Sequence, residues 1–176
     1  MTALAIDVLL TIDPSTTATG WAVTELCQGS PPRLTLARAG HPARGVLMLD
    51  GITWVSRCGA TRAELETIVR KFHPDRIICE IPETWKTMTG RGAALGGSLL
   101  RLGFVSGCMM GISSHAITQY VSANEWKGQT PKSLTRERVR DFFGHDEPNE
   151  HIADALGIAR WFYREKARGG FGGAKK

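Results

Sequence analysis

Short apolar runs separated by turn-forming residues open the chain. Residues 8–12 (VLLTI), 21–26 (WAVTEL) and 34–40 (LTLARAG) have the length and composition of short strands. The polar stretches DPSTTATG and CQGSPPR separate them. This spacing predicts an antiparallel meander rather than strands joined by helices.

The hydrophobic period changes after the third predicted strand. Within residues 44–72 apolar side chains recur on one side of a helix, which His73 and Pro74 end. Two more strands and three more helices follow: strands 76–81 and 116–123, and helices 93–112, 133–144 and 148–167. We therefore expect an α/β fold, with one domain over residues 1–167. Its sheet would be mixed and five-stranded, with the first three strands antiparallel, and flanked by helices.

The apolar stretch of residues 93–112 could be mistaken for a membrane span. It carries one charge, Arg101, and its Gly103, Gly107 and Gly111 repeat the small-residue spacing of packed membrane helices. The frequent glycines and the central arginine instead favour a helix of a soluble protein that lets another helix approach closely. We expect no membrane partner; the approaching helix belongs either to the same chain or to a second copy across a homodimer interface.

The net charge of +5 arises from 22 Lys and Arg residues against 17 Asp and Glu residues, which favours an anionic partner such as nucleic acid. Residues 160–176 hold six bases and one acid, so the net charge of this stretch equals the net charge of the whole chain. Residues 168–176 (RGGFGGAKK) are predicted to be a disordered, basic, Gly-rich tail that either adds phosphate contacts or aids solubility. The four cysteines form no Cys-x-x-Cys pair and no signal peptide is recognised, so we expect a cytoplasmic protein with free thiols.

Three acids stand where apolar residues would be expected. Asp13 ends the first strand, Glu80 lies inside IICEI, and Asp154 lies among the apolar positions of the last helix. Any one of them could simply cap a helix or accept a backbone N–H. Two carboxylates about 4 Å apart repel by about 4 kcal/mol at an effective dielectric constant near 20, so a cluster of three requires protons or a cation. Such oxygen-rich clusters suit Mg²⁺ or Mn²⁺.

His151 precedes Asp154 by three positions, so the two side chains share one face of the predicted helix. The histidine could be a metal ligand, a proton-transfer group, or a capping residue at the start of the helix. Glu150 lies one turn before Asp154 and is a further candidate acid.

Four segments together resemble the RuvC-type Holliday junction resolvases, which have the ribonuclease H-like fold. These segments are TIDPSTTATGWAV, IICEIP, YVSANEWKGQTPK and HIADALGIA, and the resemblance runs over residues 8–165. The short linker between the motifs looks closer to the phage-type members. Ser15 stands where many members have glycine.

This resemblance implies a homodimeric, Mg²⁺-dependent endodeoxyribonuclease of a bacterial or phage-infected cell that cuts four-way DNA junctions symmetrically. Mn²⁺ would substitute, two ions would bind per active site, and the products would carry 5′-phosphate and 3′-hydroxyl ends. The resemblance places four residues in the catalytic and metal-binding set: Asp13, Glu80, His151 and Asp154. Two cations shared by such a set fit in-line phosphodiester hydrolysis.

Two segments are candidate DNA contacts. Lys127 and Lys132 match the lysines of the third motif, although their spacing is shorter than in the bacterial pattern. Members of this family insert an aromatic residue near the loop that follows the second acid, and here that loop offers Trp85, Lys86 and Arg91. Stacking of an aromatic ring on an unpaired base would favour branched DNA over duplex.

Three other functions remain open. A ribonuclease H-like nuclease acting on flaps, forks or RNA would keep the same acids. A catalytically silent nucleic-acid-binding protein would keep the lysines but would not need an acid cluster. An actin-like ATPase would share the IDPSTTATGWAV loop, yet it would need a second lobe and far more than 176 residues.

Overall fold

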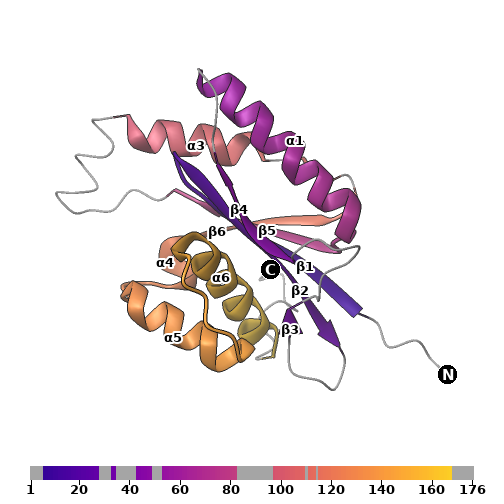
Figure 1. Ribbon diagram of the computed structural model, residues 1–176, viewed down its shortest axis with the longest axis vertical. Helices are drawn as coiled ribbons and strands as arrows, with labels where there is room; N and C mark the ends of the chain where they lie inside the picture. Colours follow the sequence, from indigo (N-terminus) through magenta and orange to yellow (C-terminus); the bar gives the residue numbers. More distant parts are fainter. Residues whose placement is uncertain are drawn as a thin grey trace, which may run out of the picture.

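The computed structural model describes residues 6–27, 33–34, 43–48, 53–82, 97–109, 111–113 and 115–167, and in it a mixed sheet lies between two layers of helices (Figure 1). The strands are β1 (Ile6–Pro14), β2 (Ala18–Cys27), β3 (Arg33–Leu34), β4 (Arg44–Met48), β5 (Arg76–Ile81) and β6 (Ile117–Ser122). The helices are α1 (Trp54–Phe72), α3 (Ser98–Cys108), α4 (Ala123–Trp126), α5 (Lys132–Phe143) and α6 (Glu150–Ala167).

The described strands form one sheet in the order β3-β2-β1-β5-β6, with β4 also paired to β2. β1 pairs antiparallel with β2, whereas β5 and β6 continue the sheet in parallel. β3 and β4 follow one another along the edge of β2 that faces away from β1, so the described sheet is five strands wide. The expected mixed sheet with antiparallel first strands is therefore confirmed.

The prediction was wrong between the third strand and the first helix. Arg44–Met48 is a strand paired with residues 18–22 of β2, not the beginning of a helix. The helix begins at Trp54, because the Thr53 side chain accepts the Ser56 backbone N–H and the Ser56 hydroxyl accepts the Thr53 N–H. This reciprocal cap satisfies amide groups that the first helical turn leaves unpaired. Of the predicted strand over residues 34–40, the structure describes only Leu34, in β3.

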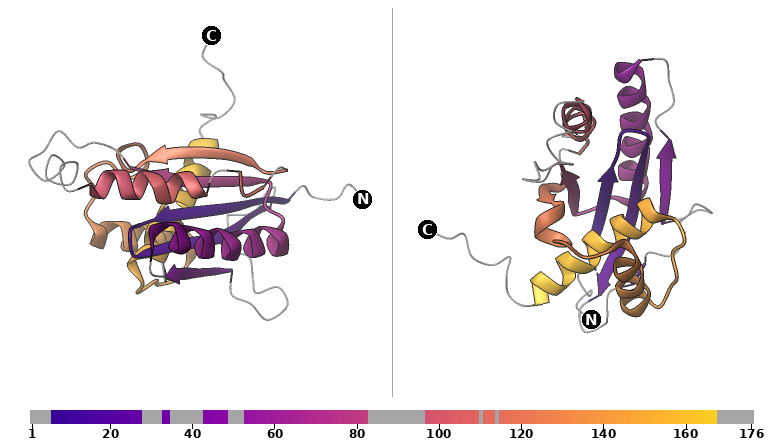
Figure 2. Two further views of the ribbon diagram at one scale, coloured as in Figure 1. Left: turned by 90° about the horizontal axis from the view of Figure 1, so that it is seen from above. Right: turned by 90° about the vertical axis from the view of Figure 1, so that its left-hand side faces the viewer.

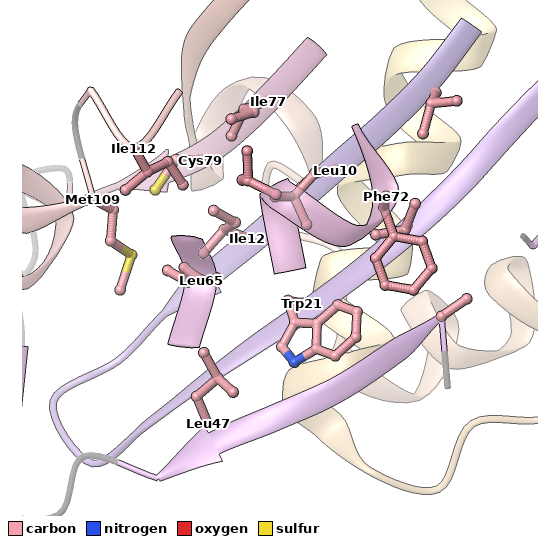
Figure 3. Packing of buried hydrophobic residues seen from close by; sticks show 14 of the residues in the cluster. Leu10, Ile12, Trp21, Leu47, Leu65, Phe72, Ile77, Cys79, Met109 and Ile112 are labelled. Carbon is pink, nitrogen blue, oxygen red and sulfur yellow. The ribbon is translucent and has the colours of Figure 1, made fainter. Parts of the chain in front are cut away.

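Alternation along the strands divides the core between the two faces of the sheet. Leu10 and Ile12 pack with the side chains of α1 and α3 (Figure 3). Leu9 packs instead with Phe162 and other residues of α6. Figure 2 shows the same division: α1 and α3 cover one face, and α5 and α6 cover the other. Asp13 has the parity of Leu9 and so belongs to the face covered by α6.

The later helices lie close to their predicted positions. α5 is capped by Gly144, which adopts the left-handed conformation with φ of 67°. The Gly144 N–H donates to the Arg140 carbonyl. α3 lies inside the predicted 93–112 stretch, and no described helix is long and apolar enough to cross a membrane. The predicted tail over residues 168–176 lies outside the described part of the chain.

Candidate active site

Two of the predicted acids lie side by side on neighbouring parallel strands. The register pairs Ile12 of β1 with Cys79 of β5, so the next residues along, Asp13 and Glu80, are adjacent at the carboxyl end of both strands. Ile78 packs among residues of α6, and Glu80 has the same parity. Both carboxylates therefore belong to the face of the sheet that α6 covers.

A glycine allows α6 to approach this edge of the sheet. Gly20 of β2 lies opposite Asp13 in the antiparallel register, and a Cβ atom at Gly20 would overlap the backbone carbonyl of His151. His151 Nδ1 lies 3.5 Å from Asp13 Oδ2 as a result. Asp154 follows one turn later and is buried, so α6 supplies two of the predicted residues to the edge that carries Asp13.

The residues before α6 fix where this helix begins. The Asn149 side-chain oxygen accepts the backbone N–H of His151 and that of Ile152, as an N-cap does. Buried Glu147 accepts the Asn149 N–H and also pairs with Arg44 of β4 at 2.7 Å. The start of α6 is thereby tied to the edge of the sheet, and the position of His151 follows from it.

Burial and mutual repulsion shape the ionisation of the acids. Burial raises the pKa of Asp13, which the His151 contact opposes and the nearby Asp154 charge reinforces. Burial, followed by the charge of Asp13, raises the pKa of Glu80 to about 7. The Asp13 carboxylate in turn raises the pKa of His151 above its ordinary value. The charge of Asp154 thus reaches both Asp13 and Glu80 and contributes to raising the pKa of each.

Two neighbouring residues of the chain hold the remaining acids. Glu80 Oε2 accepts the indole N–H of Trp126 at 2.7 Å, and Lys127 Nζ lies 3.1 Å from Asp154 Oδ2. With the side chains placed in this way, no three acid, histidine or cysteine groups of the described residues converge on one point as a metal-binding group. The donor set nevertheless fits a divalent cation, because repelling carboxylates at one edge of the sheet are the oxygen ligands that such ions prefer.

Solved structures of other proteins share this architecture. *Thermus thermophilus* RuvC in complex with a Holliday junction substrate aligns with a TM-score of 0.62 and 21% identity over 93% of this chain and 97% of the RuvC chain.

The chain has the fold of RuvC. A second *T. thermophilus* RuvC structure gives the same TM-score, with 22% identity over 92% of this chain and 96% of RuvC. The yeast mitochondrial Holliday junction resolvase Ydc2 aligns with a TM-score of 0.56 and 13% identity, over 92% of this chain and 82% of Ydc2. No protein-family model matches the chain, and neither does any curated protein sequence.

On this RuvC fold the predicted DNA contacts have different surroundings. Lys127 pairs with Asp154. Lys132 begins α5 and pairs instead with Glu150, at the start of α6. Glu150 is exposed and its pKa is lowered by this lysine, so here it is a partner of Lys132 rather than a member of the acid group. The predicted contacts Trp85, Lys86 and Arg91 lie outside the described residues.

Sequence reasoning missed two residues that help to form the site. Gly20 is part of the TGWAV stretch, but its packing against His151 depends on how α6 docks onto the sheet. Trp126 is part of the NEWK stretch, and nothing in the local sequence shows that its indole N–H reaches Glu80, 46 positions earlier. A polar-tipped aromatic next to a candidate lysine was the only available signal.

Proposed function

We propose that the protein is a metal-dependent endodeoxyribonuclease that resolves four-way DNA junctions as a homodimer. The observation that carries this proposal is the set of carboxylates Asp13, Glu80 and Asp154 at one edge of a RuvC-type sheet. *T. thermophilus* RuvC, which shares the fold over nearly its whole length, binds a Holliday junction substrate. Fold alone does not determine function, so the acids and their surroundings must support the chemistry.

The three carboxylates would hold Mg²⁺ or Mn²⁺, with two ions per active site. When bound, these cations supply an activated water and stabilise negative charge on the leaving 3′-oxygen. Asp13 is central to the set, since its charge affects the pKa of Glu80 and its own pKa responds to Asp154. The cations would also offset the cost of burying these charges and the repulsion between them.

His151 and Lys127 provide protons and positive charge beside the acids. His151 Nδ1 faces Asp13, which favours the protonated imidazole, so His151 could orient the attacking water or exchange a proton with it. In the protein without cations or DNA, the ammonium group of Lys127 pairs with the carboxylate of Asp154. When cations and DNA are bound, Lys127 would be released from Asp154 to contact the scissile phosphate.

A basic crevice next to Lys127 supports a nucleic-acid substrate. Its described lining contains Lys127, Arg138 and Arg160, two threonines and no acid. Burial lowers the pKa of Arg160, and the positive charges of Arg164 and Arg138 lower it further. Two arginines beside Lys127 concentrate positive charge here, which favours phosphate binding, so we assign this crevice to the DNA backbone flanking the cleavage site.

The outer face of α3 supports the proposed dimer. Leu100 is 81% exposed and Phe104 is 48% exposed, while Gly103 and Gly107 lie on the same face. In the part of the chain that the structure describes, a Cβ atom at Gly107 would meet no atom of another element within 4 Å. An exposed apolar stripe interrupted by glycines allows close helix packing, and we propose that α3 pairs with α3 of a second copy.

The test is a cleavage assay on matched labelled substrates in Mg²⁺: a mobile four-way junction, a linear duplex, a 5′-flap and an RNA–DNA hybrid of the same sequence. We expect cleavage of the junction only, and no cleavage in EDTA. Preference for the flap or the hybrid would show that the same chemistry acts on another substrate, and would contradict the assignment to four-way junctions. Tight binding without cleavage in either Mg²⁺ or Mn²⁺ would contradict the proposed activity and indicate a silent binding protein.

A further inference from the structure

Trp126 is a buried residue whose polar atom is directed at the candidate active site. The side chain is 9% exposed and its indole Nε1–H donates to Glu80 Oε2 at 2.7 Å. The bond occupies one of the two carboxylate oxygens of Glu80. Among the described residues, no side-chain hydrogen bond is recorded to the other oxygen, Oε1.

The backbone delivers Trp126 to Glu80 through the sheet. β6 pairs in parallel with β5, with Val121 opposite Glu80, and α4 begins directly after β6. A reciprocal cap between Ser122 and Glu125 fixes the first turn of α4: the Ser122 hydroxyl accepts the Glu125 N–H, and a Glu125 carboxylate oxygen accepts the Ser122 N–H. The strand pairing and the cap together determine where Trp126 lies.

A glycine on α6 accommodates the indole ring. A Cβ atom at Gly157 would lie 2.5 Å from Cζ3 of Trp126, closer than packed atoms approach. Gly157 is three positions after Asp154, so the ring packs against α6 one turn beyond this acid. The indole is therefore held between α6 and Glu80.

Lys127 extends the same arrangement. Its Nζ atom lies 3.1 Å from Asp154 Oδ2 and 4.8 Å from the centre of the Trp126 ring. Two consecutive residues at the end of α4 thus each hold one acid of the candidate site.

The geometry points to Trp126 as a positioning residue for cation binding: its indole N–H fixes the Glu80 carboxylate so that Oε1 is presented to the divalent cation. The inference rests on the proposed function, since it takes Glu80 as a metal ligand. Outer partners that orient a ligating carboxylate affect metal affinity directly, and removing one typically weakens binding 10- to 100-fold. If the indole had only a structural role, its hydrogen bond to Glu80 would merely satisfy the buried N–H and would not affect cation binding.

The test compares Trp126→Phe with Trp21→Phe. Both changes replace a buried indole by a smaller ring, but Trp21 Nε1 has no hydrogen-bond partner among the described residues and packs on the other face of the sheet. Mn²⁺ binding is measured by electron paramagnetic resonance of free Mn²⁺, without DNA. We expect about 10-fold weaker Mn²⁺ binding for Trp126→Phe. For Trp21→Phe we expect a lower melting temperature and a Mn²⁺ affinity within about two-fold of wild type.

Steady-state cleavage supplies the second measurement. Trp126→Phe should lower kcat at a fixed Mn²⁺ concentration with KM for the junction unchanged, and higher Mn²⁺ should restore part of the rate. If Trp126→Phe does not fold, Gly157→Ala displaces the ring while keeping its N–H, and it should weaken Mn²⁺ binding in the same way.

Different failures can be told apart. Unchanged Mn²⁺ affinity in a folded Trp126→Phe or Gly157→Ala protein would overturn the positioning role while leaving the proposed nuclease intact. A wild-type protein that neither binds Mn²⁺ nor cleaves the junction would overturn the proposed function, and the positioning role with it.

Discussion

Replacing Glu80 by glutamine should stabilise the metal-free protein at alkaline pH. An ionised Glu80 is largely buried and faces the charge of Asp13, and both effects raise its pKa to about 7 from an ordinary value of 4.5. Glutamine is neutral at every pH and keeps an oxygen that can accept the Trp126 N–H. The substitution therefore removes an unfavourable charge without removing the hydrogen bond.

The pH dependence follows from comparing the folded and unfolded carboxyl groups. The folded protein holds the Glu80 proton more tightly, so the stability associated with it is fully present below pH 4.5 and is lost as the pH rises through 7. Each unit between the two pKa values corresponds to about 1.4 kcal/mol. At pH 8 the metal-free wild type should therefore be about 3 kcal/mol less stable than Glu80→Gln.

Urea unfolding in EDTA at pH 5 and pH 8 measures this difference. The advantage of Glu80→Gln should fall below about 1 kcal/mol at pH 5, because the wild-type carboxyl is then protonated when folded. Adding Mg²⁺ at pH 8 should favour the wild type, since a cation that binds the folded state stabilises it. A glutamine variant that is no more stable than wild type at pH 8 in EDTA would refute the electrostatic reasoning.

Three further substitutions and one control test the site, the dimer and the DNA surface. Gly20→Ala should lower stability by about 1–3 kcal/mol in urea unfolding and abolish cleavage, because its methyl group displaces the backbone of His151; normal activity would contradict this docking. Gly107→Leu should give a folded monomer in sedimentation, whereas a persistent dimer would show that α3 is not the interface. Arg160→Gln should lower the slope of log K against log salt by about 0.9 on junction and duplex alike, as expected for one lost phosphate contact. Arg70→Gln on α1 removes the same charge from the other face and should leave the slope unchanged.

Much of the fold could be predicted because it depends on local patterns. The strand RIICEI and the final helix are marked by apolar period and by flanking Pro and Asn residues. Alternation along β1 and β5 also explains why Asp13 and Glu80 share a face. By contrast, Arg44–Met48 pairs with a strand more than 20 residues earlier, and no local pattern distinguishes such a strand from the beginning of the next helix.

The candidate site was only partly predictable for the same reason. The three-residue spacing of His151 and Asp154 places them on one helix face from sequence alone. The approach of His151 to Asp13 requires Gly20, and the partners of Glu80 and Asp154 come from α4. These contacts depend on how helices dock on the sheet, which a residue pattern does not specify.

The central claim is that the acids at this edge of the sheet support paired cleavage of two opposing strands of a four-way DNA junction. The most direct measurement is mapping of the nicks at nucleotide resolution on a junction labelled in each of its four strands, in Mg²⁺, for wild type and Asp154→Asn. Paired nicks at symmetrical positions on two opposing strands, absent from Asp154→Asn and in EDTA, are the predicted result. Cleavage that survives Asp154→Asn, or nicks without symmetry, would contradict the assignment.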